Sequence, residues 1–86
     1  MIRKAVTVHT EHGLDPHLAG ALAEYALKYP CMIHLIRGDK EVSAKSLLGV
    51  LSLEIRHVTE LEIICDGAGE TEAMDDMSEY INHMTS

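Results

Sequence analysis

The chain has 86 residues and a composition typical of one globular domain, with 47% hydrophobic and 24% charged residues. Its formal charge of −7 disfavours binding to nucleic-acid backbones or anionic membranes, since both need a basic face. No segment resembles a signal peptide or a membrane span. We therefore expect a single cytoplasmic domain over residues 1–86, with an aliphatic and Met-based core. Cys31 and Cys65 are predicted to be reduced, buried thiols, with one disulfide as the alternative.

The first half of the chain predicts a strand, a helix and a second strand. Alternating hydrophobic residues indicate a strand over residues 2–8. After a polar turn, Asp15-Pro16 is typical of a helix start, because Asp accepts hydrogen bonds from first-turn amides and proline at N1 loses none. The helix is expected to run to about Lys28, before Pro30, and a strand to follow over residues 32–37. The predicted buried side of this helix comprises Leu18, Ala19, Leu22, Ala23, Ala26 and Leu27.

The second half predicts a hairpin, a short helix, a strand and a final helix. A tight turn at 38–40 leads into a strand at 41–43, and an apolar helix follows at 46–53. Alternation from Glu60 to Asp66 indicates a fourth strand, which Ile64 interrupts. The last helix begins near Glu70, and its apolar residues recur at helical spacing. These are Ala73, Met74, Met77, Tyr80, Ile81 and Met84, and we interpret the Met stripe as core.

The order β-α-β-β-α-β-α predicts an α+β fold. We expect one four-stranded, mostly antiparallel sheet with three helices on one face and the other face open, an open-faced β-sandwich.

The stretch from Ser43 to Leu53 contains the strongest functional signal. Ser46 directly precedes an apolar run, at a helix N-cap, where its hydroxyl can accept from first-turn amides. A phosphoryl group there would meet those amides and the positive end of the helix dipole, with Lys45 as a nearby cation. A helix this short cannot point all of its apolar residues inward; they are Leu47, Leu48, Val50, Leu51 and Leu53. In the simpler interpretation, Ser46 only caps the helix and the leucines are mostly core.

The element order and two stretches resemble the HPr family, the small phosphocarriers of the bacterial sugar phosphotransferase system. The stretches are Gly13-Leu14-Asp15-Pro16-His17 and the run from Ala44 to Leu53, of which Ala44-Lys45-Ser46-Leu47-Leu48-Gly49 is the most specific part. The resemblance covers nearly the whole chain. It implies an HPr-type fold in a protein that is not an enzyme and uses no cofactor.

One position departs from the family pattern. A phosphocarrier of this family has its phospho-accepting His directly after Gly-Leu, then Arg two residues later and Pro after it. This chain has Asp15 at the His position, His17 at the Arg position and Leu18 at the Pro position. A carboxylate is a poorer nucleophile here, and its charge repels the phosphoryl donor. The resemblance therefore implies the fold, whereas Asp15 argues against the usual carrier chemistry.

The Ser46 region matches the family. In Gram-positive-type members, HPr kinase/phosphorylase phosphorylates the matching Ser from ATP, and the phosphoserine form binds a catabolite-control transcription factor. The catabolite-repression HPr proteins (Crh) lack the active His and keep this Ser, and the present chain is similar to that branch, with Asp instead of Gln. The resemblance implies a regulatory protein of carbon catabolite control that acts through phosphorylation of Ser46. The implied partner-binding residues are Lys45, Leu47, Leu48, Leu51 and His17.

The turn before the first helix leaves three other hypotheses. The chain has six histidines, and His9, His12, Asp15 and His17 are close in sequence, so a metal-binding module is one, since imidazole suits Zn, Ni or Cu. Its simpler counterpart is a solvated turn in which Asp15 caps the helix, worth ~1 kcal/mol. In the second hypothesis, His17 or His12 takes over the phosphoryl group. In the third, Asp15 imitates phosphohistidine, with one negative charge in place of roughly two.

Overall fold

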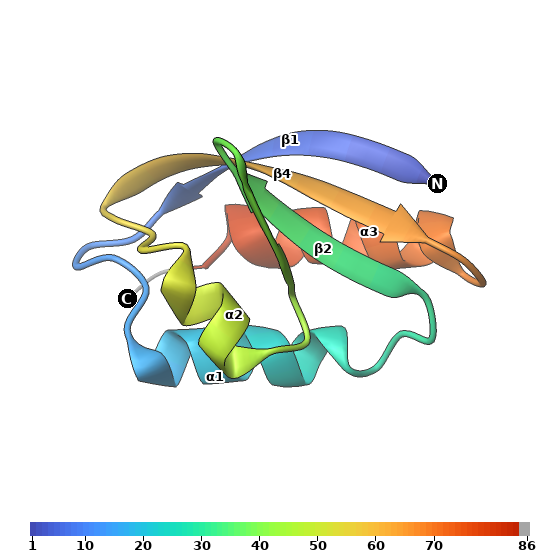
Figure 1. Ribbon diagram of the computed structural model, residues 1–86, viewed down its shortest axis with the longest axis horizontal. Helices are drawn as coiled ribbons and strands as arrows, with labels where there is room; N and C mark the ends of the chain where they lie inside the picture. The colour runs from blue at the N-terminus through green and yellow to red at the C-terminus, as the bar shows by residue number, and fades with distance from the viewer. Residues whose placement is uncertain (85–86) are drawn as a thin grey trace.

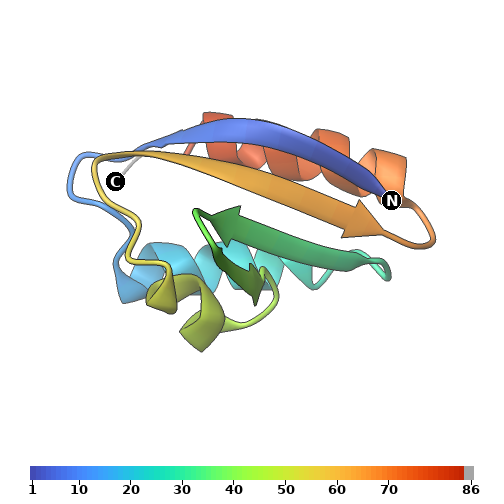
Figure 2. The ribbon, with the colours of Figure 1, turned by 45° about the horizontal axis from the view of Figure 1, so that its top comes forward.

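The computed structural model describes residues 1–84, which form one four-stranded antiparallel sheet and three helices (Figure 1). In chain order the elements are β1 (Ile2–His9), α1 (Pro16–Ala26), β2 (Met32–Arg37), β3 (Lys40–Ser43), α2 (Leu47–Ser52), β4 (Val58–Asp66) and α3 (Glu70–Asn82). The strand order is β1-β4-β2-β3, and the sheet lies in front of α1 and α3 (Figure 2). The predicted α+β architecture is confirmed. Residues 85–86 of the predicted domain lie outside the described residues.

The core lies between the sheet and the helices. Every second residue of the central strands is buried, as expected when side chains alternate across a sheet. The largest fully buried side chains are Leu22, Ile33, Leu35, Ile63, Met77, Ile81, Val8, Val50 and Cys65. Cys31 and Cys65 are free, buried thiols. Burial, followed by the proximity of Cys31, raises the pKa of Cys65 to about 11, so this thiol is unreactive at neutral pH.

Helix α1 is shorter than predicted, and its buried side is narrower. Leu27 was expected on the buried side, but it caps the helix and is 62% exposed. The amides of Lys28 and Tyr29 bond three residues back, to Tyr25 and Ala26, which tightens the last turn and ends the helix. Leu18 is only half-buried.

Strand β4 begins two residues before the predicted alternation, at Val58, which pairs with His9 of β1. The interruption at Ile64 has a cross-strand explanation. Ile64 belongs to the uncovered face of the sheet yet is only 6% exposed. Its partners in register are Arg3 of β1 and His34 of β2, whose long side chains flank it.

A backbone clamp joins the turn before α1 to the segment that follows α2. The amide of Leu14 donates to the carbonyl of Ile55 at 3.0 Å, and that of Thr10 donates to the carbonyl of His57 at 2.9 Å. The ring Nδ1 of His57 also contacts the carbonyl oxygen of Thr10. Gly13 is required here, because its φ is +79° and a Cβ on it would lie 2.8 Å from the oxygen of Ile55.

We predict that Gly13→Ala lowers the free energy of unfolding more than Gly38→Ala does. Both glycines have positive φ, +79° and +63°, so each substitution introduces a left-handed strain of ~1–2 kcal/mol. Only Gly13 also brings a new Cβ against a carbonyl, since nothing lies within 4 Å of a Cβ on Gly38. Urea unfolding of the two variants measures the difference. Equal losses would show that the contact with Ile55 does not constrain the turn.

Candidate functional site

Asp15 caps α1 in the way the sequence predicts. Its backbone is extended, Pro16 follows at the first helical position, and its Oδ1 accepts a hydrogen bond from the amide of Leu18 at 2.8 Å. The carboxylate therefore lies at the positive end of the helix dipole, where an anion is favoured. His17 is exposed in the same first turn.

Ser46 caps α2, and this prediction is also confirmed. Its Oγ accepts from the amide of Gly49 at 3.0 Å, and its carbonyl accepts from Val50 at 2.9 Å. A Cβ on Gly49 would approach the carbonyl oxygen of Ser43 to 3.3 Å, so a small residue suits the turn. Ser46 is exposed, which leaves its hydroxyl at the surface while it serves as a cap.

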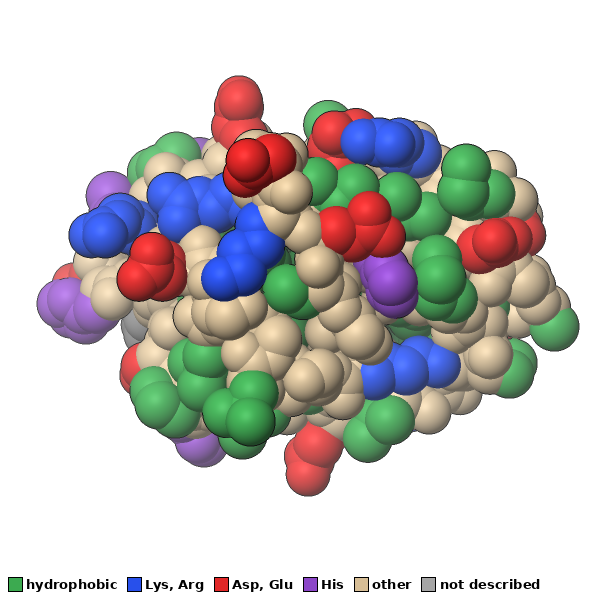
Figure 3. Space-filling view, viewed as in Figure 1, with side chains coloured by type: hydrophobic (Ala, Val, Ile, Leu, Met, Phe, Trp, Pro, Cys, Tyr) green, Lys and Arg blue, Asp and Glu red, His purple; other side chains and the backbone are tan. Residues whose placement is uncertain are grey.

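The leucines of α2 divide between the core and the surface. Val50 and Leu53 are buried, and Leu51 is half-buried against the core. Leu47 is 41% exposed and Leu48 77% exposed. Figure 3 shows hydrophobic side chains gathered over α2 at the lower left of this face. Of the three leucines predicted to bind a partner, two are therefore displayed to solvent beside Ser46.

Helices α1 and α2 form one continuous surface. The Cδ1 atom of Leu47 lies 3.9 Å from the position that a Cβ on Gly20 would occupy. Gly20 is three residues after His17, so the two are neighbours on one face of α1. We call the surface formed by Asp15, His17, Ser46, Leu47 and Leu48 the α1–α2 surface.

Lys45 lies elsewhere than expected. Its ammonium donates to the carbonyls of Tyr29 at 2.6 Å and Cys31 at 2.8 Å, so it ties the segment after α1 to the start of α2. We expected this ammonium to lie beside a phosphate on Ser46, but it is bound to these two backbone carbonyls instead. Both acceptors are distant from Lys45 in sequence, so local sequence patterns do not reveal them.

Two further cations, which the sequence did not single out, hold the end of α2. Arg37 Nη1 donates to the carbonyls of Leu53 and Glu54, both at 2.7 Å. Lys40 Nζ donates to the carbonyl of Ser52 at 2.9 Å. Cations at a helix C-terminus donate to its free carbonyls and are attracted by the negative end of its dipole. The hairpin of β2 and β3 thus fixes α2 from its C-terminal end.

The metal hypothesis receives no support from the described part of the chain. Within residues 1–84, no three or more His, Cys, Asp or Glu side chains gather as a metal site would require. His9, His12, Asp15 and His17 therefore do not form a metal site there.

Among the same residues, no helix is both long enough and hydrophobic enough to cross a membrane.

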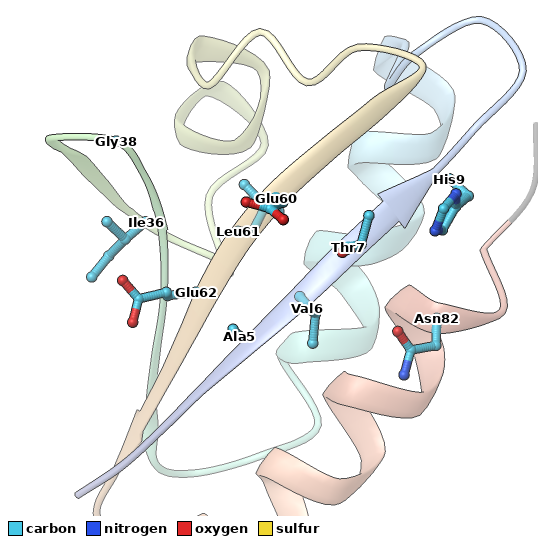
Figure 4. Close-up of a pocket in the computed structure, with 10 residues that line it drawn as sticks. All are labelled: Ala5, Val6, Thr7, His9, Ile36, Gly38, Glu60, Leu61, Glu62 and Asn82. Atoms are coloured by element: carbon cyan, nitrogen blue, oxygen red, sulfur yellow. The ribbon is translucent and has the colours of Figure 1, made fainter.

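A hollow of about 510 Å³ lies on the uncovered face of the sheet (Figure 4). Glu60 and Glu62 extend into it from β4, whereas His9 and Asn82 lie on the other side of β1. Arg3 already forms a two-point ion pair with Glu62, at 2.7 and 3.0 Å, and lowers the pKa of that carboxyl. The hollow is shallow and divided by an edge strand, and we place the functional site on the α1–α2 surface instead.

A family model described as "PTS HPr component phosphorylation site" matches residues 2–83. The chain belongs to the HPr family. The HPr-like protein Crh of Bacillus subtilis strain 168 is 30% identical over 81 residues, which cover 94% of this chain and 95% of Crh. The structure of phosphocarrier HPr from Bacillus anthracis strain Ames matches with TM-score 0.87 and 28% identity, over 93% of this chain and 95% of the other. HPr-C-His from Thermoanaerobacter tengcongensis matches with TM-score 0.88 and 25% identity, over 94% and 91%.

These matches confirm the predicted HPr family, its likeness to the Crh branch and the HPr-type sandwich. Proteins of the HPr family are phosphocarriers rather than enzymes, and Crh is a regulatory protein. The whole HPr fold is therefore present.

We predict that Asp15→Ala lowers the free energy of unfolding by ~1 kcal/mol, because the amide of Leu18 loses its acceptor. Asp15→Asn should retain most of that stability, since Asn caps about as well as Asp. Thermal and urea unfolding of both variants measure this. If Asn proved as costly as Ala, the charge of Asp15 rather than its hydrogen bond would be what stabilises α1.

Proposed function

We propose that this chain is a regulatory HPr protein of carbon catabolite control. It does not carry phosphoryl groups on histidine, and it acts through phosphorylation of Ser46 and binding to protein partners. The observation that carries the proposal is the position of Ser46, an exposed hydroxyl directly before two exposed leucines. We also propose a cytoplasmic location, in keeping with the family.

Asp15 supports the loss of carrier activity. A phosphocarrier needs an imidazole nitrogen that attacks a phosphoryl group and then stores it. Here a carboxylate has that position, and one of its oxygens already accepts from the amide of Leu18. Its negative charge repels an incoming anionic donor. His17 has the place of the family's Arg, so the group that would stabilise the phosphoryl group is absent as well.

Phosphorylation of Ser46 supplies a switch that this surface can use. The γ-phosphoryl group of ATP passes to Oγ, with loss of the hydroxyl proton and release of ADP. The product adds a charge of about −1.5 to −2 beside Leu47 and Leu48. Because the cation of Lys45 is bound to the carbonyls of Tyr29 and Cys31, the partner must supply the positive group that reads the phosphate.

The partners fall into two classes. One is a kinase of the HPr kinase/phosphorylase type, which must reach Ser46. The other is a regulatory target such as a catabolite-control transcription factor, which would combine a cation for the phosphoserine with an apolar recess for Leu48. His17 and Leu47 belong to the same α1–α2 surface, so a partner bound there can contact both helices.

We predict that HPr kinase/phosphorylase and ATP add one phosphoryl group to the wild-type protein and none to Ser46→Ala. Ser52→Ala is the matched control, because Ser52 lies in the same helix but its hydroxyl donates to the carbonyl of Gly49 at 2.6 Å. Intact-protein mass spectrometry measures the gain, and circular dichroism verifies folding. A phosphorylated Ser46→Ala variant would refute the site assignment.

We predict that Leu48→Ala weakens binding of the Ser46-phosphorylated protein to a catabolite-control transcription factor about tenfold, as for an interface anchor. Its stability should change by less than ~0.5 kcal/mol, because the side chain is 77% exposed. Val58→Ala is the control, since Val58 is 55% exposed at the start of β4, away from α2. Calorimetric titration of the three proteins decides. Equal affinity of wild type and Leu48→Ala would remove α2 from the interface.

A further inference from the structure

All three tyrosines of the chain meet at the seam between α1 and α3, and the chain has no Trp or Phe. Tyr25 stacks on Tyr80, with ring centroids 4.4 Å apart and planes inclined by 22°. Tyr29 meets Tyr25 edge to face at 5.9 Å. The core is otherwise aliphatic, so the aromatic surface of this protein is concentrated in one place. Tyr25 and Tyr29 come from the first half of the sequence, and Tyr80 comes from the last helix.

The seam is open. Between the two helices lies a hollow of about 770 Å³. It is lined by Leu18 and Tyr25 of α1, by Asp76, Glu79 and Tyr80 of α3, and by His83 and Met84, which follow α3. Its volume is within the range of ligand-binding clefts. One end reaches the first turn of α1 at Leu18, so the groove adjoins the α1–α2 surface without being part of it.

The walls of the groove are held in place by contacts within the protein. The hydroxyl of Tyr29 donates to Asp76 Oδ2 at 2.5 Å and lies 3.4 Å from the hydroxyl of Tyr25. Burial, reinforced by the bond to Asp76, raises the pKa of Tyr29, so this hydroxyl remains a donor at neutral pH. The groove is therefore preformed, which lowers the entropic cost of binding.

The charge of the groove is negative. Every charged side chain of α3 is acidic, and its last turn has no basic residue to oppose the helix dipole. Glu79 is exposed at the groove and forms none of the ion pairs found in the described residues. One cation already forms a cation–π contact with this aromatic stack, since Lys28 Nζ lies 4.1 Å from the ring centroid of Tyr25. The ring of Tyr80 and the carboxylate of Glu79 offer the same chemistry to a second cation.

We propose that the α1–α3 groove docks an arginine side chain from a basic segment of a partner protein. The planar guanidinium lies against the ring of Tyr80 and pairs with the carboxylate of Glu79. Arginine fits better than lysine, because guanidinium stacks on aromatic rings, is more weakly hydrated and matches a carboxylate at two points. This surface is separate from Ser46, so the inference does not depend on the proposed phosphorylation.

The test uses intrinsic tyrosine fluorescence, which reports on this seam alone because all three tyrosines lie there. The probe is a short peptide of alternating glycine and arginine without aromatic residues. We expect a saturable change on titration, and about fivefold weaker binding for Glu79→Gln. Glu72→Gln is the matched control: it removes the same charge from an exposed residue of α3 outside the groove lining, and should leave the Kd unchanged.

Three results would overturn the proposal. Equal weakening by Glu72→Gln would mean diffuse attraction to an acidic helix. Undiminished binding of the same peptide with citrulline in place of arginine would mean that no cation is recognised. Equal binding of spermidine would mean that charge alone, without stacking, is sufficient. Because Glu79 is exposed, its variant is expected to fold, and a fluorescence spectrum like that of the wild type before titration verifies this.

Discussion

The contact between Gly13 and the carbonyl of Ile55 determines where the functional surface can form. The turn before α1 lies on the segment after α2, with hydrogen bonds from Leu14 to Ile55 and from Thr10 to His57. Because a side chain at Gly13 would collide with that carbonyl, the two segments can approach this closely only with glycine there. The clamp brings the start of α1 next to α2. The positions of Asp15 and of the Ser46 helix are therefore linked through the backbone as well as through the packing of Leu47 near Gly20.

Most of the cations in this chain are used internally. Arg37, Lys40 and Lys45 donate to backbone carbonyls, Arg3 pairs with Glu62, and Lys28 lies over Tyr25. The carboxylates outnumber these groups, so the surface offered to partners is acidic, in accord with the net charge of −7. Two features follow from the same distribution of charge. A partner must provide the cation for a phosphate on Ser46, and the groove between α1 and α3 attracts a positive side chain.

The sequence predicted the local features well. The caps at Asp15 and Ser46 depend on bonds to amides three residues away, so adjacent residues suffice to predict them. The chain order of the elements and the single antiparallel sheet followed from alternation and from the family resemblance, whereas the order of the strands within the sheet was not predicted. The contacts of Lys45 were missed because its acceptors, Tyr29 and Cys31, lie before the β2–β3 hairpin and Lys45 lies after it. The tyrosine seam was missed for the same reason, since Tyr80 meets Tyr25 only through the packing of α1 and α3.

The donor from which the wild-type protein accepts a phosphoryl group tests the central claim most directly. Two parallel incubations, one with ATP and HPr kinase/phosphorylase and one with phosphoenolpyruvate and the first enzyme of the phosphotransferase system, are followed by intact-mass measurement. A regulatory protein without a carrier histidine gains one phosphoryl group from ATP and none from phosphoenolpyruvate. A gain from phosphoenolpyruvate would contradict this account and would identify a displaced histidine, such as His17 or His12, as the carrier. No gain from ATP would contradict the role of Ser46.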